Sequence, residues 1–145
     1  PEVLVTIGGL GTALAAASIS STQFDISEFD VSAGGTLSAT VNYNEQVTVV
    51  GSPTIVVTNS QAGGGSAATL TLTKSAATAN AITFTLVVGA AGSTISADDV
   101  LSIGAQNVAL AGGTIKDTAA ATDTNALVAI SAGAGSIAGT ITAIA

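Results

Sequence analysis

The sequence predicts an all-β fold, a sandwich of two sheets with about seven strands, on three observations. Apolar and hydroxyl-bearing residues alternate along several segments, which is the period of a half-buried strand. Glycine-rich clusters interrupt these segments at short intervals. Ala, Thr, Gly and Ser occupy 82 of the 145 positions and only four residues are aromatic. The core is therefore expected to be a thin layer of Val, Ile and Leu side chains between two sheets.

Three central segments carry the alternation most clearly. In Leu37–Tyr43, the residues Leu, Ala, Val and Tyr share one face, whereas Ser, Thr and Asn share the other. Thr69–Thr73 places two leucines between three threonines, and Ile82–Leu86 places two threonines between Ile, Phe and Leu. Each segment is expected to be a strand with an apolar face toward the core and a polar face toward water.

Clusters of turn-forming residues separate the expected strands. Glycine supplies the backbone conformations that tight turns require, and the clusters are spaced as a sandwich of short strands requires. The clusters are Gly34–Gly35, Gly51–Pro53, Gly63–Ser66, Gly89–Gly92 and Gly112–Gly113. Together with the alternation, they predict a sandwich body over residues 22–131.

The two ends of the sequence differ from this body. Residues 1–21 contain an apolar piece, a Gly-rich stretch and an Ala/Ser run, and residues 132–145 carry no charged side chain. We expect both to be extended arms that pack on neighbouring subunits, because a free apolar strand is a sticky edge. The alternative is that they complete the sheet of their own body. The residues expected to contact a partner are Val3, Leu4, Val5, Ile7, Ile137, Ile141 and Ile144.

Composition and charge exclude several classes of function. Nine acidic residues against two lysines give a net charge of −7, which repels nucleic acids and anionic membrane surfaces. No uninterrupted apolar run is long enough to span a membrane. The sequence has no Cys, His, Met, Trp or Arg, so it lacks the commonest general base and the thiolate nucleophile. No enzymatic activity is therefore expected.

The start of the sequence does not read as a secretory signal. No positively charged region precedes the apolar residues, and Glu2 has the opposite sign. The simplest expectation is a chain that begins at Pro1 without export. A mature protein already cleaved from its signal would give the same sequence.

Three pieces of residues 35–130 form one ordered pattern. Thr36–Val57 is a strand followed by Glu-x-Val, Val-x-Gly-x-Pro and a second strand, and Ala81–Val88 is a Thr-containing strand before a glycine turn. Asn107–Asp117 ends in Gly-Gly-Thr-Ile-x-Asp. In this order, the pieces resemble the bacterial Ig-like repeats of surface adhesins and phage structural proteins, whereas residues 118–124 lack the glycine and asparagine that usually follow the closing signature. The resemblance implies an Ig-like β-sandwich with a binding or scaffolding role and no active site.

Four aspartates are candidate ligands for Ca²⁺, a cation that takes about six to eight oxygen ligands. They are Asp98, Asp99, Asp117 and Asp123, which lie near expected strand ends. The resemblance implies that such junctions hold calcium in secreted repeats. The alternative is structural: Asp98 and Asp99 would cap a turn after Ser96, and Asp117 would lie in a loop. No other cofactor is expected.

Two classes of function remain. The first is a non-enzymatic structural protein of an assembled particle, specifically a bacteriophage virion component such as a capsid decoration or tail accessory protein. Such a subunit would dock through its arms onto other virion subunits, as a homo-oligomer or as a lattice-bound copy. The alternative is an Ig-like domain of a secreted bacterial adhesin or surface-layer protein, located outside the cell or on its surface. A host-surface glycan is a candidate ligand for the exposed Thr/Ser-rich face.

Overall fold

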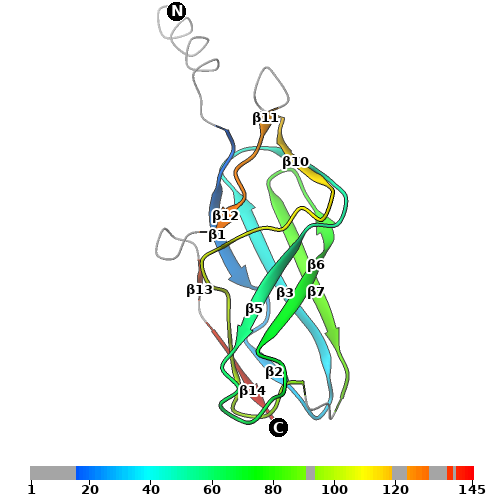
Figure 1. The fold of residues 1–145 in the computed structure, drawn as a ribbon, viewed down its shortest axis with the longest axis vertical. Helices are drawn as coiled ribbons and strands as arrows, with labels where there is room; N and C mark the ends of the chain where they lie inside the picture. The colour runs from blue at the N-terminus through cyan, green and yellow to red at the C-terminus, as the bar shows by residue number, and fades with distance from the viewer. Residues whose placement is uncertain (1–15, 91–93, 119–123, 131–136, 139) are drawn as a thin grey trace, which may run out of the picture.

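The chain folds into strands and turns (Figure 1). A computed structural model describes residues 16–90, 94–118, 124–130, 137–138 and 140–145. These residues form no helix, so the predicted all-β class is confirmed. Their fourteen strands are β1 Ile19–Phe24, β2 Glu28–Asp30, β3 Gly35–Tyr43, β4 Val47–Val50, β5 Thr54–Asn59, β6 Thr69–Ala77, β7 Ala81–Val88, β8 Val100–Ser102, β9 Gln106–Asn107, β10 Thr114–Asp117, β11 Thr124–Asn125, β12 Ala129–Ile130, β13 Ile137–Ala138 and β14 Ile141–Ile144.

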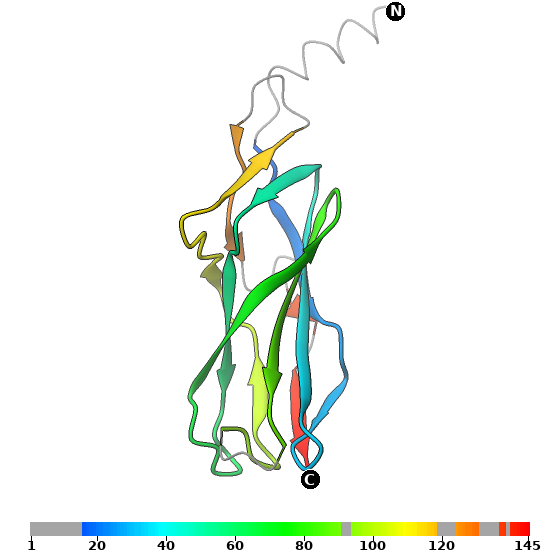
Figure 2. The ribbon, with the colours of Figure 1, turned by 90° about the vertical axis from the view of Figure 1, so that its right-hand side faces the viewer.

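Nine of these strands form one curled sheet. Their order is β13-β1-β3-β7-β6-β5-β8-β14-β2. Neighbours are antiparallel except for two parallel pairs, β1 with β13 and β14 with β2. Because β2 also contacts β3, the last strand of the order returns toward the third. The sheet therefore wraps around one elongated core (Figures 1 and 2).

The predicted alternation is confirmed in the centre of the curled sheet. Strands β3 and β7 stay in register over eight residue pairs. Their alternating apolar positions from Leu37 to Phe84 face the core, whereas Leu86 is half-buried and Val87 is exposed, and the hydroxyl-bearing positions face outward. Burial of the apolar side chains is the main favourable term in folding. The side chains with 0% exposure in the central strands include Leu37, Val41, Leu72, Ile82 and Phe84.

Two small sheets lie in the half of the body farther from the C-terminus, and the one that contains β10 and β11 lies at its end (Figures 1 and 2). Their strand orders are β11-β10-β4 and β12-β9. Val47 of β4 and Ile115 of β10 face the core with 6% and 2% exposure. The Tyr43 hydroxyl at the end of β3 donates a hydrogen bond to the Leu127 carbonyl at 2.9 Å. This bond ties the curled sheet to the segment between β11 and β12.

The predicted turn clusters Gly51–Pro53, Gly63–Ser66 and Gly112–Gly113 fall between strands, and Gly34 directly precedes β3, which begins at Gly35. Gly34 shows why glycine is needed in such turns. Its φ is +70°, in the left-handed region that glycine adopts without steric cost. A Cβ at this position would lie 2.6 Å from the Ala90 backbone nitrogen. The number of strands differs from the seven predicted because six of the fourteen contain only two or three residues. Such short strands cannot display an alternating pattern.

The C-terminal region differs from the expected arm. Strand β13 pairs with β1, and β14 lies between β8 and β2, so the boundary expected between residues 131 and 132 does not separate these strands from the body. The physical reason is the alternation within β14. Ile141 and Ala143 face the core with 0% and 1% exposure, whereas Thr142 and Ile144 face outward.

The expected N-terminal arm is described only in its last residues. Ala17 is fully buried and β1 begins at Ile19, so these residues belong to the body and the boundary at residue 21 is too late. Ala17 N donates to the Asp117 carboxylate at 2.9 Å, and Leu127 N donates to the Ala17 carbonyl at 2.8 Å. The predicted partner-contacting residues Val3, Leu4, Val5 and Ile7 lie outside the described residues.

Candidate functional site

The groove that holds β14 is the candidate docking site. Strand β14 runs antiparallel to β8 on one side and parallel to β2 on the other. Asp98 N donates to the Ala143 carbonyl at 2.8 Å, and Ala143 N donates to the Asp99 carbonyl at 2.8 Å. On the other side, Val31 N donates to the Ile144 carbonyl at 2.9 Å. Backbone groups on both edges of β14 are therefore paired, as in an interior strand.

The inward face of the groove is apolar. Ile141 lies opposite Leu101 of β8, and Ala143 lies opposite Phe29 of β2. Each of these four residues is exposed by 4% or less. The groove therefore combines backbone hydrogen bonds with a buried apolar contact, which are the two components of strand addition to a sheet.

The three predicted partner residues at the C-terminal end occupy different positions. Ile141 is buried within its own chain, opposite Leu101, as described above. Ile144 is 38% exposed and remains accessible to another molecule. Ile137 lies in β13 with its backbone opposite Thr22 of β1.

The buried carboxylate of Asp99 holds a loop and a turn together at this end of the molecule. Its side chain has 0% exposure. Oδ1 accepts hydrogen bonds from Gly63 N at 2.8 Å and Gly65 N at 3.5 Å. Oδ2 accepts from Asn59 Nδ2 at 2.9 Å and Ser96 N at 3.0 Å. Asp99 thus connects the loop after β5 to the turn before β8, whose backbone holds β14.

The loop closes tightly around this carboxylate. Burial raises the pKa of the Asp99 carboxyl, but the hydrogen bonds from Ser96, Asn59, Gly63 and Gly65 outweigh that effect and hold the pKa below its ordinary value. A Cβ on Gly65 would collide with the Asp99 carboxylate, and a Cβ on Gly63 would collide with the Ala97 carbonyl. The glycine cluster at residues 63–66, predicted as a simple turn, therefore forms a loop that binds the Asp99 carboxylate.

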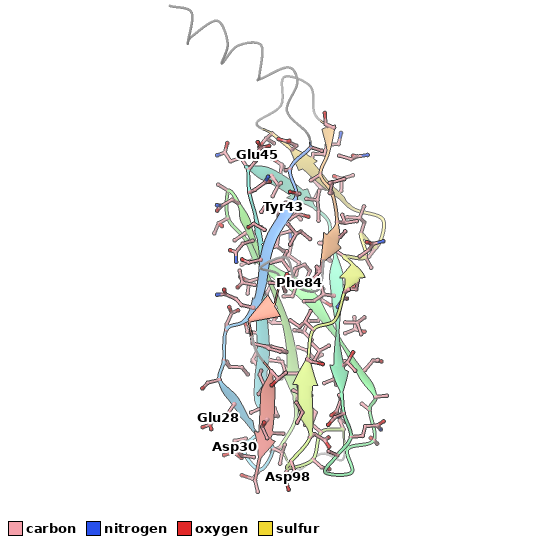
Figure 3. All side chains as sticks on the ribbon, turned by 90° about the vertical axis from the view of Figure 1, so that its left-hand side faces the viewer. Glu28, Asp30, Tyr43, Glu45, Phe84 and Asp98 are labelled. Carbon is pink, nitrogen blue, oxygen red and sulfur yellow. The ribbon has the colours of Figure 1, made fainter. Side chains whose placement is uncertain are left out.

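The four predicted calcium ligands do not converge. Asp98 lies near the C-terminal end of the body, at the opposite end from Glu45 (Figure 3). Asp117 lies in β10, and its register partner in β4 is Val47. Because Val47 is only two residues after Glu45, Asp117 lies near the Glu45 end of the body. The Asp117 carboxylate accepts a hydrogen bond from Ala17 N. Asp123 lies outside the described residues. Within the described part of the chain, no three residues among Asp, Glu, His and Cys are grouped to hold a metal ion.

The acidic segment that includes β2 uses two of its carboxylates in local hydrogen bonds. Asp25 accepts from Ser38 Oγ at 2.6 Å and Thr40 Oγ1 at 2.8 Å. Asp30 accepts from Ser32 Oγ at 2.6 Å and from the backbone nitrogens of Ser32 and Ala33. The Ser32 hydroxyl, together with these backbone groups, lowers the pKa of the exposed Asp30 carboxyl. Both carboxylates therefore order the turns that flank β2.

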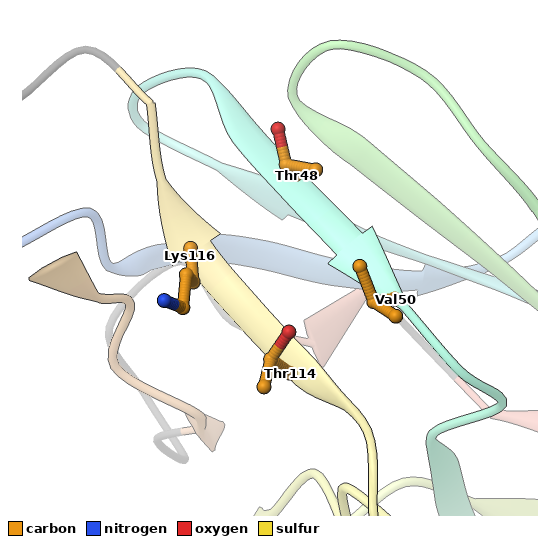
Figure 4. A pocket seen from close by; sticks show the side chains of 4 residues that line it. All are labelled: Thr48, Val50, Thr114 and Lys116. Carbon is orange, nitrogen blue, oxygen red and sulfur yellow. The ribbon is translucent and has the colours of Figure 1, made fainter. Parts of the chain in front are cut away.

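A hollow of about 380 Å³ lies on the outer face of β4 and β10 (Figure 4). It is lined by Thr48, Val50, Thr114 and Lys116. Thr48 is opposite Lys116 and Val50 is opposite Thr114 in the strand register, so the four side chains share one face. Val50 is 59% exposed. This lining offers two hydroxyls, one valine and one ammonium group.

The outer face of the central strands is rich in hydroxyls, two of which, on Ser38 and Thr40, donate to the Asp25 carboxylate. Thr73 of β6 is in register with Thr54 of β5 and with Thr85 of β7, which is in register with Ser38 of β3. Val87, 77% exposed, is the most exposed large apolar residue on this face. The outward hydroxyl-bearing residues are Thr36, Ser38, Thr40, Thr54, Thr58, Thr69, Thr71, Thr73, Thr83 and Thr85.

The comparisons with known proteins identify no relative. No protein-family model, no curated protein and no solved structure matches the chain. Among the described residues, no helix is long and apolar enough to cross a membrane.

Sequence reasoning missed the carboxylate-binding loop, although one signal points to it. Ile55 and Val57 alternate as inward residues of β5, and the same period places Asn59 inward. A buried amide needs hydrogen-bond partners, and a glycine cluster follows immediately at residues 63–65. Asn59 in fact donates to both Ala67 O and Asp99.

Proposed function

We propose that the chain is an Ig-like β-sandwich. In an immunoglobulin-type sandwich, strands A, B, E and D form one sheet and strands C, F and G form the other. Labelling β1, β3, β5, β6, β7, β8 and β14 as A to G in chain order gives neighbours β1-β3-β7-β6 and β5-β8-β14. Both groups reproduce the immunoglobulin order. Pairing of β5 with β6 joins the two groups into the single curled sheet.

We further propose that the protein is a non-enzymatic structural subunit of an assembled particle, in the form of a bacteriophage virion component such as a capsid decoration or tail accessory protein. The observation that carries this proposal is the docking of β14. It is a short apolar strand held by hydrogen bonds on both sides and by a buried face. Strand addition of this kind is a general mode of attachment between proteins.

The chemistry of the described side chains supports a structural role. The carboxylates of Asp25, Asp30 and Asp99 accept hydrogen bonds that fix turns and strands. The outer face of the central sheet is rich in hydroxyls, and the chain carries a net charge of −7. An acidic surface of this type keeps copies soluble before assembly.

Quantitative mass spectrometry of purified particles from the source organism tests this proposal. We expect the chain at a fixed, simple ratio to the major shell protein, because a symmetric lattice offers a fixed number of equivalent positions. If the chain is instead absent from particles and occurs only in the medium or on the cell surface, the virion proposal is wrong.

The alternative proposal is an Ig-like domain of a secreted adhesin or surface-layer protein. The hydroxyl-rich face of β3, β7, β6 and β5 favours it, since hydroxyl groups both donate and accept hydrogen bonds to an uncharged ligand such as a host glycan. Retention of the purified chain on immobilised host-surface glycans, reduced by Thr71→Asp and unaffected by Thr48→Asp on another face, would support this alternative.

A further inference from the structure

We propose that the groove between β8 and β2 also accepts β14 from a second copy of the chain, so that neighbouring copies are joined by strand exchange. This proposal deepens the proposed function and rests on it for its setting, an assembled particle. The structure identifies the occupant, because the groove is filled by the residues Ile-Thr-Ala-Ile of β14. An identical strand from another copy makes the same contacts, which is why exchange of identical elements is a low-cost route to association.

The groove requires a strand to complete it. Among the described residues, β2 is paired with no strand other than β14. Without β14, the Val31 and Asp98 backbone nitrogens lose their acceptors and Ala143 no longer covers Phe29. Unpaired backbone groups beside exposed apolar surface favour the addition of another strand. A groove left open in one copy is therefore an acceptor for β14 of the next.

The sequence before β14 is long enough to bridge two copies. Ten residues, 131–140, separate Ile130 from Ile141, and the eleven steps between these two residues span at most about 40 Å when extended. β14 itself, with four residues, is only about 13 Å long. Between Ile130 and β14, the described contact that must also be released is the pairing of β13 with β1 over two residues. The exchanged strand therefore reaches a copy whose β2 and β8 lie within that distance of Ile130.

The outward side of β14 suits a contact between copies. Thr142 and Ile144 carry no charge, and Ile144 leaves 38% of its surface exposed. Strand β14 therefore presents no charged side chain of its own to the contact. Glu28, Asp30 and Asp98 lie at the same end of the molecule (Figure 3), and the repulsion between two acidic ends keeps copies separate at low salt.

Disulfide trapping tests the exchange, because the chain has no cysteine of its own. Glu28 and Thr142 are register partners in β2 and β14, and both are exposed. Neighbouring strands lie about 5 Å apart, which is within the Cα separation that a disulfide accepts. Full-length Glu28→Cys and Thr142→Cys chains are mixed in denaturant, refolded together at high concentration and oxidised. Mass spectrometry then identifies the heterodimer by its mass.

The matched control replaces the second chain by Thr71→Cys, an exposed position on the outer face of β6. We expect about tenfold more heterodimer from the Glu28→Cys and Thr142→Cys mixture than from this control, because exchange raises the local concentration of the two thiols. An equal yield from both mixtures overturns strand exchange. The double variant Glu28→Cys/Thr142→Cys, refolded when dilute, should form the disulfide within one chain and so establishes that the two positions are close enough.

The two proposals fail in different ways. If the heterodimer does not form but the chain is found at a fixed ratio in particles, strand exchange is wrong and the structural role stands. If the heterodimer forms but particles lack the chain, the exchange stands and the virion role is wrong.

Discussion

The central strands and the groove strands of this protein are held together by different means. The central group, β3, β5, β6 and β7, contains strands of six to nine residues, joined by long registers such as the eight pairs between β3 and β7. The groove group, β2, β8 and β14, contains strands of three or four residues with two or three register pairs at each contact. The central group is therefore stabilised by long runs of pairing between its own strands. The groove group depends instead on contacts with the segments around it.

The difference shows how short strands become part of a fold. In the groove group, the strands are far apart in sequence, so no short-range pairing brings them together. The hydrogen bonds of the buried Asp99 connect its loop to the turn before β8, and β14 pairs with both β8 and β2. We therefore expect changes in the centre to affect the whole molecule, and changes in the groove to act locally.

The largest expected effects come from the same truncation in each region. Ile82→Ala in β7 and Ile141→Ala in β14 both remove a side chain with 0% exposure, at a typical cost of about 2–5 kcal/mol. For Ile82→Ala, we expect the full loss in the free energy of unfolding measured with denaturant. For Ile141→Ala, we expect faster hydrogen exchange at the Asp98, Ala143 and Val31 amides, with β3 and β7 still protected.

The two isoleucine variants also provide the outcome that would contradict the comparison. Equal loss of protection across all strands in both variants would mean that centre and groove unfold as one cooperative unit. In that case the groove strands would not open independently of the body.

A smaller effect is expected from closing the carboxylate-binding loop with a methyl group. Gly63→Ala places a Cβ against the Ala97 carbonyl, and such overpacking typically costs about 1–3 kcal/mol. Gly104→Ala is the matched control, because no atom lies within 4 Å of its Cβ position and its φ is not positive. Thermal unfolding should show a lower Tm for the first variant alone. An equal Tm for the two variants would show that the loop tolerates rearrangement.

Replacing the buried Asp99 carboxylate tests how far its charge and hydrogen bonds stabilise the loop beside the groove. Asp99→Asn points an amide NH₂ at backbone donors, and an unmatched buried donor costs about 1–3 kcal/mol. Because the folded-state pKa of Asp99 is lowered, its contribution is present above the ordinary Asp pKa and is lost as pH falls below about 4. The variant should therefore show a weaker dependence of stability on acid pH. An unchanged dependence on acid pH in Asp99→Asn would contradict this role of the carboxylate.

The smallest expected effect concerns the hydroxyl that ends β3. Tyr43→Phe removes the hydrogen bond to the Leu127 carbonyl, which is worth about 0.5–1.5 kcal/mol. Burial raises the pKa of Tyr43 to about 12, so the native chain should lose stability as pH rises above the ordinary Tyr pKa, about 10. Denaturant titrations from neutral to alkaline pH should show that loss in the native chain and a smaller one in the variant.

The centre of the fold was predictable because local pattern and environment agree there. Leu70 and Leu72 face the core and the flanking threonines face outward, as the period of two requires. The groove was not predictable in the same way. Strand β2 contains three residues, and its parallel pairing with β14 joins segments more than one hundred residues apart. No local pattern specifies such a partner.

The candidate site was predictable in composition but not in arrangement. The apolar character of Ile141 and Ile144 identified a strand that docks, yet the sequence could not say whether the acceptor was this chain or another. The aspartates were recognised as a set with two possible roles, but spacing alone did not separate them into opposite ends of the body. Asp99 required tertiary information, since its donors Asn59 and Gly63 lie some 40 residues earlier in the chain.

The position of β14 determines how the molecule responds to tension. This strand runs roughly along the long axis of the body and ends at the C-terminus (Figure 2), so a pull along that axis acts parallel to the strand. Its hydrogen bonds to β2 and β8 then carry the load in shear, side by side, and must break nearly together. A strand peeled from its end would instead release them one at a time. We therefore expect the pairing of β14 with β2 and β8 to resist a pull along the long axis better than a pull across it.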